Sequence, residues 1–124
     1  LGRTPAGFKP ARVIDARGCI VTPGFTEVGA RLREPGQEHK ATIASELEAA
    51  AAAGFTTVCC MPDTQPVIDT PAVVELVNQR ARGVRGARVR CLGALTRDLG
   101  GAVLAEMAAL KDIGCVGVAN AGRA

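Results

Sequence analysis

The sequence predicts an α/β fold in which parallel strands alternate with helices, and two observations carry this prediction. Residues 55–61 form a continuous apolar and β-branched run, which is typical of a strand buried on both faces of a parallel sheet. Strand-like runs also recur about every 30 residues with helical patterns between them, the period of a right-handed βαβ unit. A closed barrel of such units needs about 250 residues, so we expect this chain to supply roughly the first four strands and to be part of a longer protein.

The segment before the run at 55–61 contains many turn-forming residues. Prolines and glycines predict irregular structure over residues 1–11, and short strands are expected at 12–14 and 19–21. Two Pro-Gly turns then bracket a further short strand within 22–36. Side chains on a strand alternate with period two, so residues 27, 29, 31 and 33 are expected on one side of it.

Helical periodicity separates the strands. Thr42 can cap a helix that stops at Gly54, and Thr70-Pro71 starts a second helix that ends near Gly83. The remaining expected elements are a strand over 87–95, a helix over 102–112 and a strand over 115–119.

Composition argues against several functional classes. The net charge of +3 is spread along the chain, apart from a modest arginine cluster between residues 80 and 90. Without a dense basic stripe or stacking aromatics, we expect no nucleic-acid binding. No apolar run approaches the roughly 18 residues of a membrane span, and nothing resembles a signal peptide, so we expect a soluble cytoplasmic protein without membrane contact.

Cysteine spacing gives no sign of a metal or redox motif. The five cysteines are Cys19, Cys59, Cys60, Cys91 and Cys115. No pair has the two-residue spacing of a zinc knuckle or a redox site. We therefore expect buried free thiols in a reducing compartment.

A family resemblance rests on the stretch Thr22-Pro23-Gly24-Phe25-Thr26-Glu27-Val28-Gly29-Ala30-Arg31-Leu32-Arg33-Glu34-Pro35-Gly36. Together with Val13-Ile14-Asp15-Ala16-Arg17-Gly18 and Met61-Pro62-Asp63-Thr64, it resembles the start of a dihydroorotase barrel, in the cyclic amidohydrolase superfamily. The resemblance implies a (β/α)8 TIM barrel of the amidohydrolase type, with its first part at residues 22–124. Residues 1–21 would be the remnant of an N-terminal β-sandwich and its linker.

The resemblance also implies that the metal site of the family is degenerate here. The first barrel strand of the family reads Asp-x-His-x-His-x-Arg, and its two histidines bind zinc. The matching positions are Glu27, Gly29, Arg31 and Arg33. Glycine has no donor atom, and a permanently protonated guanidinium repels a divalent cation. A later family segment, Ser-Asp-Asp-Gly, contributes an aspartate in many members, whereas Asn120 and Ala121 stand there and offer no carboxylate.

Two further positions match residues that bind substrate in the family, and we treat them as vestigial. Arg33 either clamps a carboxylate or forms a structural ion pair with an acid such as Glu34. Asp63 stands where the family has an asparagine, and its charge opposes an anionic substrate. A repulsive or structural Asp63 is expected, including a turn in which it bonds its own backbone. His39 and Lys40 are expected to be solvated loop residues without a catalytic role.

Two functions from different classes follow. The first is a catalytically inactive dihydroorotase homologue without catalytic residues or cofactor, which assembles with aspartate carbamoyltransferase in pyrimidine synthesis as a homo- or hetero-oligomer. The second is an active cyclic amidase of the dihydroorotase, hydantoinase or allantoinase type. That enzyme would need zinc to activate water, with ligands from strands beyond the fourth.

Overall fold

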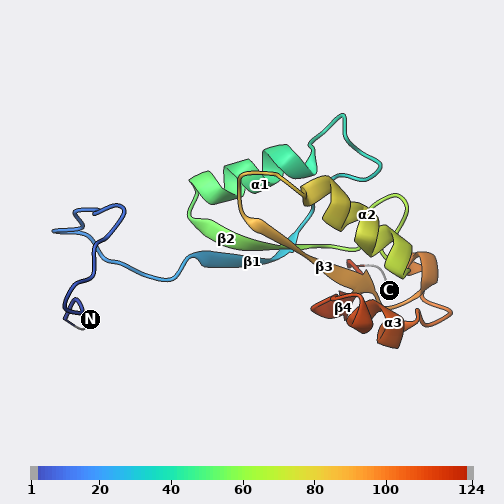
Figure 1. Ribbon diagram of the computed structural model, residues 1–124. Coiled ribbons are helices and arrows are strands. Elements are labelled where there is room, and N and C mark those ends of the chain that lie inside the picture. Colours follow the sequence, from blue (N-terminus) through green and yellow to red (C-terminus); the bar gives the residue numbers. More distant parts are fainter. Residues whose placement is uncertain (1–2, 123–124) are drawn as a thin grey trace.

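Parallel strands joined by helices form the part of the chain that the computed structural model describes, residues 3–122. The strands are β1 (Phe25–Ala30), β2 (Phe55–Cys60), β3 (Arg88–Ala94) and β4 (Gly117–Ala119), in that spatial order. The helices are α1 (Ile43–Ala52), α2 (Pro71–Ala81) and α3 (Met107–Asp112), and η1 (Arg97–Leu99) is a 3-10 turn. Neighbouring strands are parallel, and a helix separates each pair along the chain (Figure 1).

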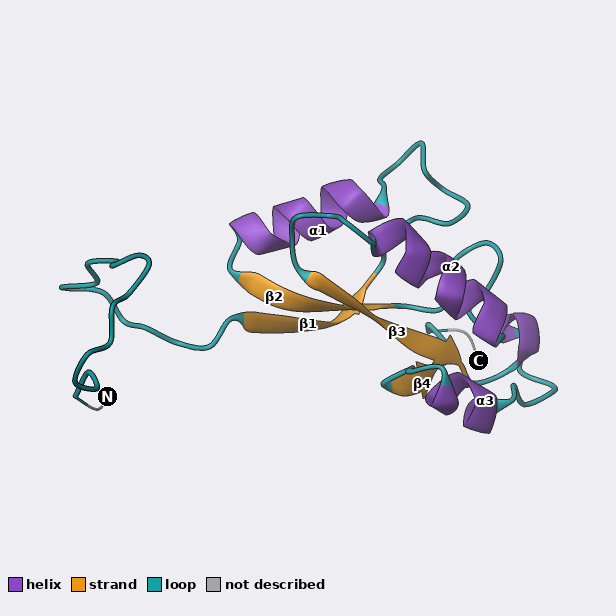
Figure 2. Ribbon diagram, viewed as in Figure 1, coloured by secondary structure: helices purple, strands orange, loops and turns teal. Residues whose placement is uncertain are grey.

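This arrangement confirms the expected α/β class and the first part of a barrel. Figure 2 shows a curled sheet with α1 and α2 on the same face, as the outer layer of a barrel requires. The rest of the barrel and the sandwich domain stay predictions. Residues 1–2 of the expected sandwich remnant and residues 123–124 of the expected barrel segment lie outside the described residues.

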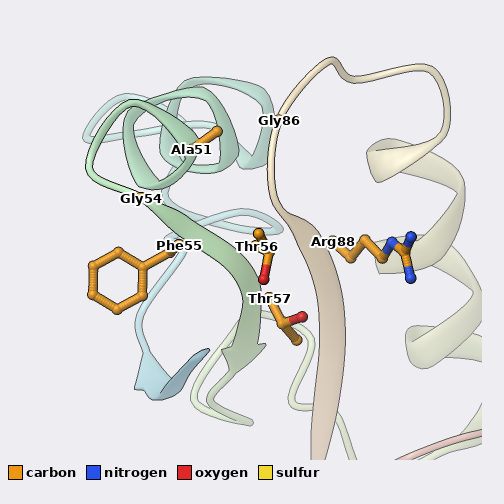
Figure 3. A pocket seen from close by; sticks show the side chains of 7 residues that line it. All are labelled: Ala51, Gly54, Phe55, Thr56, Thr57, Gly86 and Arg88. Carbon is orange, nitrogen blue, oxygen red and sulfur yellow. The ribbon is translucent and has the colours of Figure 1, made fainter. Parts of the chain in front are cut away.

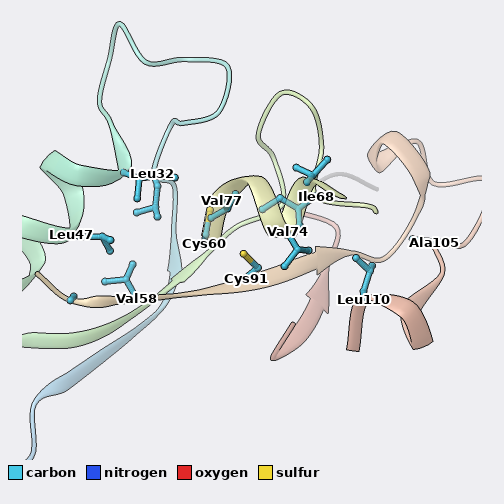
Figure 4. Close-up of a cluster of buried hydrophobic side chains, with 13 residues drawn as sticks. Leu32, Leu47, Val58, Cys60, Ile68, Val74, Val77, Cys91, Ala105 and Leu110 are labelled. Carbon is cyan, nitrogen blue, oxygen red and sulfur yellow. The ribbon is translucent and has the colours of Figure 1, made fainter. Parts of the chain in front are cut away.

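The hydrophobic core lies between the helices and the sheet (Figure 4). Helix α1 contributes Ile43 and Leu47, at most 1% exposed, and α2 contributes Val74 and Val77 at the same level of burial. These side chains pack over Val58 of β2 and its neighbours. Full burial of one such side chain contributes about 1.5–3 kcal/mol, so this layer is the main source of stability in the segment.

The predicted starts of α1 and α2 are confirmed. Ser45 N donates to Thr42 Oγ1 at 3.2 Å and Thr42 N donates to Ser45 Oγ at 3.0 Å, a reciprocal cap at the start of α1. Pro71 occupies the first turn of α2, where its missing N–H costs no hydrogen bond. The left-handed Gly54 follows α1 and leads into β2, with a φ of 90°.

The two short strands expected at 12–14 and 19–21 are absent, and those predictions are wrong. Residues 3–21 form an exposed arm that pairs with no described strand (Figure 1). Extended backbone becomes a strand only beside a ladder partner, and no described segment lies alongside this arm. The arm also carries Cys19, which is exposed, so the expectation of buried thiols fails for this cysteine.

The third helix is shorter than expected. It begins at Met107 instead of residue 102, because residues 101–103 are bends and Leu104 lies in an isolated bridge. Thr96 and Leu104 pair in an antiparallel bridge, and Arg97 N donates to Val103 O at 2.8 Å. Backbone groups that bond across this loop cannot bond within a helix. The fourth strand likewise spans only 117–119 of the predicted 115–119.

The first strand departs from the expected alternation. Its register against β2 shifts between Glu27 and Ala30, and Gly29 N donates to Glu27 Oε1 at 3.0 Å. As a result Glu27, Ala30 and Leu32 line one hollow against α1, whereas Arg31 is exposed. The expectation that the odd-numbered residues 27 to 33 share one side is therefore wrong, because an irregular register breaks the period of two.

Within residues 3–122, no helix is both long enough and apolar enough to cross a membrane.

Candidate functional site at the carboxyl ends of the strands

Polar residues at the ends of the four strands meet at one edge of the sheet, and three of them, Arg31, Asp63 and Asn120, were singled out in the sequence. Arg31 directly follows β1, Asp63 follows β2, Thr96 follows β3 and Asn120 directly follows β4. Because all four strands are parallel, their carboxyl ends lie at the same edge. In barrels of this kind that edge holds the active site, so we call these strand ends and the loops that follow them the mouth.

Arg31 and Asp63 form an ion pair across the mouth. Arg31 Nε donates to Asp63 Oδ2 at 2.7 Å, and Arg31 Nη2 makes a long hydrogen bond of 3.5 Å to Ala121 O. The side chain of Arg31 is 47% exposed and that of Asp63 is 22% exposed. Asp63 thus bonds a neighbouring strand end, and the alternative of a turn that bonds its own backbone is replaced by this pair. Its charge is compensated locally by the guanidinium.

Thr96 and Asn120 connect the other two strand ends. Thr96 Oγ1 donates to Asn120 Oδ1 at 2.8 Å and accepts a hydrogen bond from Gly101 N at 3.1 Å. Thr96 is only 5% exposed. The side-chain oxygen of Asn120 is therefore committed to a structural contact between β3 and β4. Sequence reasoning missed Thr96, because its partner lies 24 residues further along the chain.

Arg33 lies in the loop after β1 and does not form the expected pair with Glu34. Its backbone is left-handed, with a φ of 66°, and its side chain has no ion pair among the described residues. The buried Glu34 instead accepts hydrogen bonds from Arg80 of α2 and from Ile43 N, the latter at 2.7 Å. The interpretation of Arg33 as a carboxylate clamp stays a prediction, and its structural alternative with Glu34 is wrong.

Glu34 is a structural residue that sequence reasoning considered only as a partner of Arg33. It is 6% exposed, and one carboxylate oxygen accepts from the first amide of α1 while the other faces α2. A negative charge at a helix amino terminus is favourable, because the free N–H groups and the helix dipole both attract it. Arg80 lies 46 residues away, so no local pattern indicates this pair.

The loops that follow β1 and β2 pack directly against each other. Gln65 N donates to Pro35 O at 2.9 Å. Gly36 is left-handed, with a φ of 104°, and a side-chain carbon there would lie 2.5 Å from Gln65 Cβ. Only glycine fits both constraints. The second Pro-Gly pair of the motif thus holds the two mouth loops together.

The donor set at the mouth does not fit a zinc ion. The four positions that the resemblance matched to the metal site hold Gly29, Arg31, Asn120 and Ala121. The carboxylate of Asp63 is engaged by a guanidinium. Among residues 3–122, no three histidine, cysteine, aspartate or glutamate side chains gather as a possible metal site. Zinc prefers thiolate, imidazole and carboxylate ligands, so this part of the chain offers it no complete site.

His39 and Lys40 lie outside the mouth contacts. Both are exposed in the loop before α1, and Lys40 Nζ donates to Gln37 Oε1 at 2.9 Å. This placement agrees with their interpretation as loop residues.

The buried cysteines are not poised for chemistry. Cys60 and Cys91 are register partners on β2 and β3, and burial raises the pKa of each thiol to about 12. Burial also raises the pKa of the half-buried Cys115. Nucleophilic attack and metal binding need the thiolate, which is scarce at neutral pH when the pKa is raised. Burial of Cys59, Cys60 and Cys91 confirms the prediction for these three thiols.

Two hollows lie near opposite ends of the strands. The one in Figure 3 is lined by Ala51, Gly54, Phe55, Thr56, Thr57, Gly86 and Arg88. It lies at the amino ends of β2 and β3, away from the mouth. The second, of about 360 Å³, is lined by Gln37, Asp63, Thr64, Gln65, Pro66, Val67 and Asp98. Of these two hollows, the second adjoins the mouth, where Asp63 is one of its walls.

Comparisons with known proteins agree on one family. A family model described as "Dihydro-orotase-like" matches residues 18–123. A "Dihydroorotase-like protein" of Pseudomonas aeruginosa is 48% identical over 120 residues, which is 97% of this chain and 28% of that protein. A "Dihydroorotase" of Anaeromyxobacter dehalogenans is 51% identical over 115 residues, or 93% of this chain and 27% of that protein. The chain thus spans less than a third of the length of these curated relatives.

Proposed function

The chain belongs to the dihydroorotase-like family, and from that premise we propose that its protein is a catalytically inactive dihydroorotase homologue. In this proposal it acts in the cytoplasm as a structural subunit of aspartate carbamoyltransferase, in pyrimidine biosynthesis. In this role it would assemble with the transferase and stabilise it, and it would not catalyse ring opening.

One observation carries the proposal: the guanidinium of Arg31 occupies the mouth and bonds Asp63 at 2.7 Å. A divalent cation at the same place would meet a fixed positive charge, and at contact distance in a partly dry site that repulsion amounts to several kcal/mol. A guanidinium is permanently protonated in proteins. The mouth therefore resists a metal ion, while the chemistry of the family depends on one.

The helix-covered face supports a scaffold role. Its core is tightly packed although the mouth has lost metal-binding groups, and a well-formed barrel exterior is what a partner subunit would contact. Fold and reaction are separable, because the function of a barrel depends on the residues at its strand ends.

The second candidate is an active zinc-dependent cyclic amidase of the dihydroorotase, hydantoinase or allantoinase type. The observation in its favour is the 51% identity to a protein named "Dihydroorotase". Zinc in such an enzyme would polarise the ring carbonyl and activate a water molecule. Its ligands would come from other strands, Arg33 would hold a substrate carboxylate, and Arg31 would have to leave the mouth.

The two candidates are separated by a mixing experiment with the full-length protein. The protein and aspartate carbamoyltransferase from the same organism are purified separately, mixed at tens of micromolar and examined by size-exclusion chromatography with light scattering. We expect co-elution and a higher melting temperature of the transferase, because a ligand that binds only the folded state stabilises it. Hydrolysis of dihydroorotate is measured in parallel, with and without added zinc.

Independent migration, with the transferase equally active and heat-stable alone, would contradict the structural-subunit proposal. Zinc-dependent turnover of dihydroorotate would establish the second candidate.

A further inference from the structure

Arg31 makes contacts with two other strand ends. We propose that its guanidinium is a built-in cation that ties the carboxyl ends of β1, β2 and β4 together, at the place where a metal ion would otherwise link ligands from separate strands. The inference deepens the proposed function, since it says what holds the mouth when no zinc does so.

The contacts of Arg31 span the sheet. Asp63 lies 32 residues away on the neighbouring strand end, and Ala121 lies 90 residues away on the far one. Because β1 and β4 are the two outer strands of the order β1-β2-β3-β4, the contact to Ala121 O reaches from the end of one outer strand to the end of the other. Ala121 itself is left-handed, with a φ of 51°.

A guanidinium is chemically suited to this task. It carries a fixed positive charge and several N–H donors in a rigid plane, so it can bond a carboxylate on one side and a carbonyl on another. Carboxylate and carbonyl oxygens are also ligands of hard metal ions. Unlike a metal ion, the guanidinium is covalently attached and cannot be removed by a chelator.

A second link joins the end of β3 to the end of β4. Thr96 Oγ1 donates to Asn120 Oδ1 at 2.8 Å and so joins the ends of β3 and β4. With the Arg31 contacts, every strand end of the described sheet is connected to another one through a side chain. Side-chain links thus connect the ends of all four described strands, and Arg31 compensates the charge of Asp63 within these links.

Partial exposure sets the size of the expected effect. Arg31 is 47% exposed and Asp63 is 22% exposed, so water screens part of their attraction. We expect the coupling between them to change the unfolding equilibrium constant by about two- to fivefold, at the upper end of the range for exposed ion pairs.

The test is a double-mutant cycle on the full-length protein. Arg31→Met, Asp63→Asn and the double variant are unfolded in urea, with Arg85→Met as the control for loss of one exposed arginine. Each single variant should raise the unfolding equilibrium constant several-fold. The fold-increase for the double variant should be about two- to fivefold smaller than the product of the two single-variant fold-increases. The control should leave it unchanged, and a chelator should alter none of these values.

Arg31→Lys provides a second reading if the Met variants fold poorly. A lysine keeps the charge but has no planar fork for Asp63 and Ala121 together. Its stability should fall between those of the natural protein and Arg31→Met. Strictly multiplicative effects in the cycle, or a lysine variant no more stable than the Met variant, would overturn the inference.

Zinc analysis of the same samples keeps the two proposals apart. Bound zinc together with a coupled Arg31–Asp63 pair would refute the inactive-subunit proposal and support the proposal that Arg31 links the strand ends. Zinc-free protein in which Arg31 and Asp63 are not coupled would refute the proposal that Arg31 links the strand ends. It would leave the proposed subunit role in place.

Discussion

The helix-covered face of the sheet and its mouth use the same strands in different ways. On the helix-covered face, apolar side chains of α1 and α2 pack over β2 and β3 with almost no exposed surface. At the mouth, the residues that follow the strands form two polar links, Arg31 with Asp63 and Thr96 with Asn120. The first region has the form of a barrel exterior, whereas the part of the second that lies within residues 3–122 gathers no three side chains that could hold a metal ion. In this chain, the fold and the reactive site are therefore independent features.

The first prediction tests how much the apolar packing on the helix-covered face contributes to stability. Leu47→Ala should lower the free energy of unfolding by about 2–5 kcal/mol, because it leaves a cavity between α1 and the sheet where Leu47 is 1% exposed. Urea unfolding of the full-length protein measures the loss. Glu48→Ala, at the next and exposed position of α1, is the matched control and should change stability little. Equal effects of the two variants would contradict the account of the core.

The second prediction concerns the contact between the mouth loop and the helix layer. Glu34→Ala should cost about 1–3 kcal/mol, since it leaves Ile43 N and Arg80 without their acceptor in a largely buried place. The loss is measured by chemical unfolding, with His39→Ala as the exposed control in the same loop. A Glu34 variant as stable as the control would show that this buried carboxylate does not hold α1 and α2 together.

The third prediction tests the core through pH. Burial raises the pKa of Cys60 and Cys91 from an ordinary 9.0 to about 12, so the unfolded chain releases these protons first. Stability from this source is complete below pH 9 and is lost as the pH rises toward 12, by about 1.4 kcal/mol per pH unit for each thiol. Unfolding free energies of the natural protein and a Cys60→Ala/Cys91→Ala variant are compared over this range. Parallel curves would contradict the prediction.

The fourth prediction expects no gain at the mouth. Restoring two histidines by Gly29→His and Arg31→His should give no measurable hydrolysis of dihydroorotate, because a metal site needs its full ligand set and the residues that orient it. Asp63 would also lose its guanidinium partner and oppose an anionic substrate. Hydrolysis is followed with added zinc. Turnover well above that of the unmodified protein would show that the rest of the site is intact.

The sequence predicted the helix-covered face better than the mouth. Apolar periodicity and cap residues are local signals, and they placed β2, α1 and α2 within about two residues of their observed ends. The predictions of strands at 12–14 and 19–21 failed because a strand needs a pairing partner. The predicted start of α3 failed because the bridge between Thr96 and Leu104 competes with the helix. No local pattern reveals such a pairing.

For the mouth, the sequence indicated which residues to inspect but not which residues contact one another. Resemblance indicated which positions lack metal ligands, yet the bond from Arg31 to Asp63 joins residues 32 apart. The pairing of Glu34 with Arg80 in place of Arg33 also depends on how α2 lies over the mouth loop. Such partners are set by tertiary packing, and a single sequence carries no direct signal of it.

The metal content of the full-length protein tests the central claim most directly, namely that a fixed guanidinium stands where the family chemistry needs zinc. The protein is purified and dialysed without chelator, and zinc per chain is determined by mass spectrometry of the acid digest. We predict far less than one zinc per chain, unchanged by Asp63→Asn. About one tightly held zinc per chain, lost when residues of the mouth are replaced, would contradict the claim.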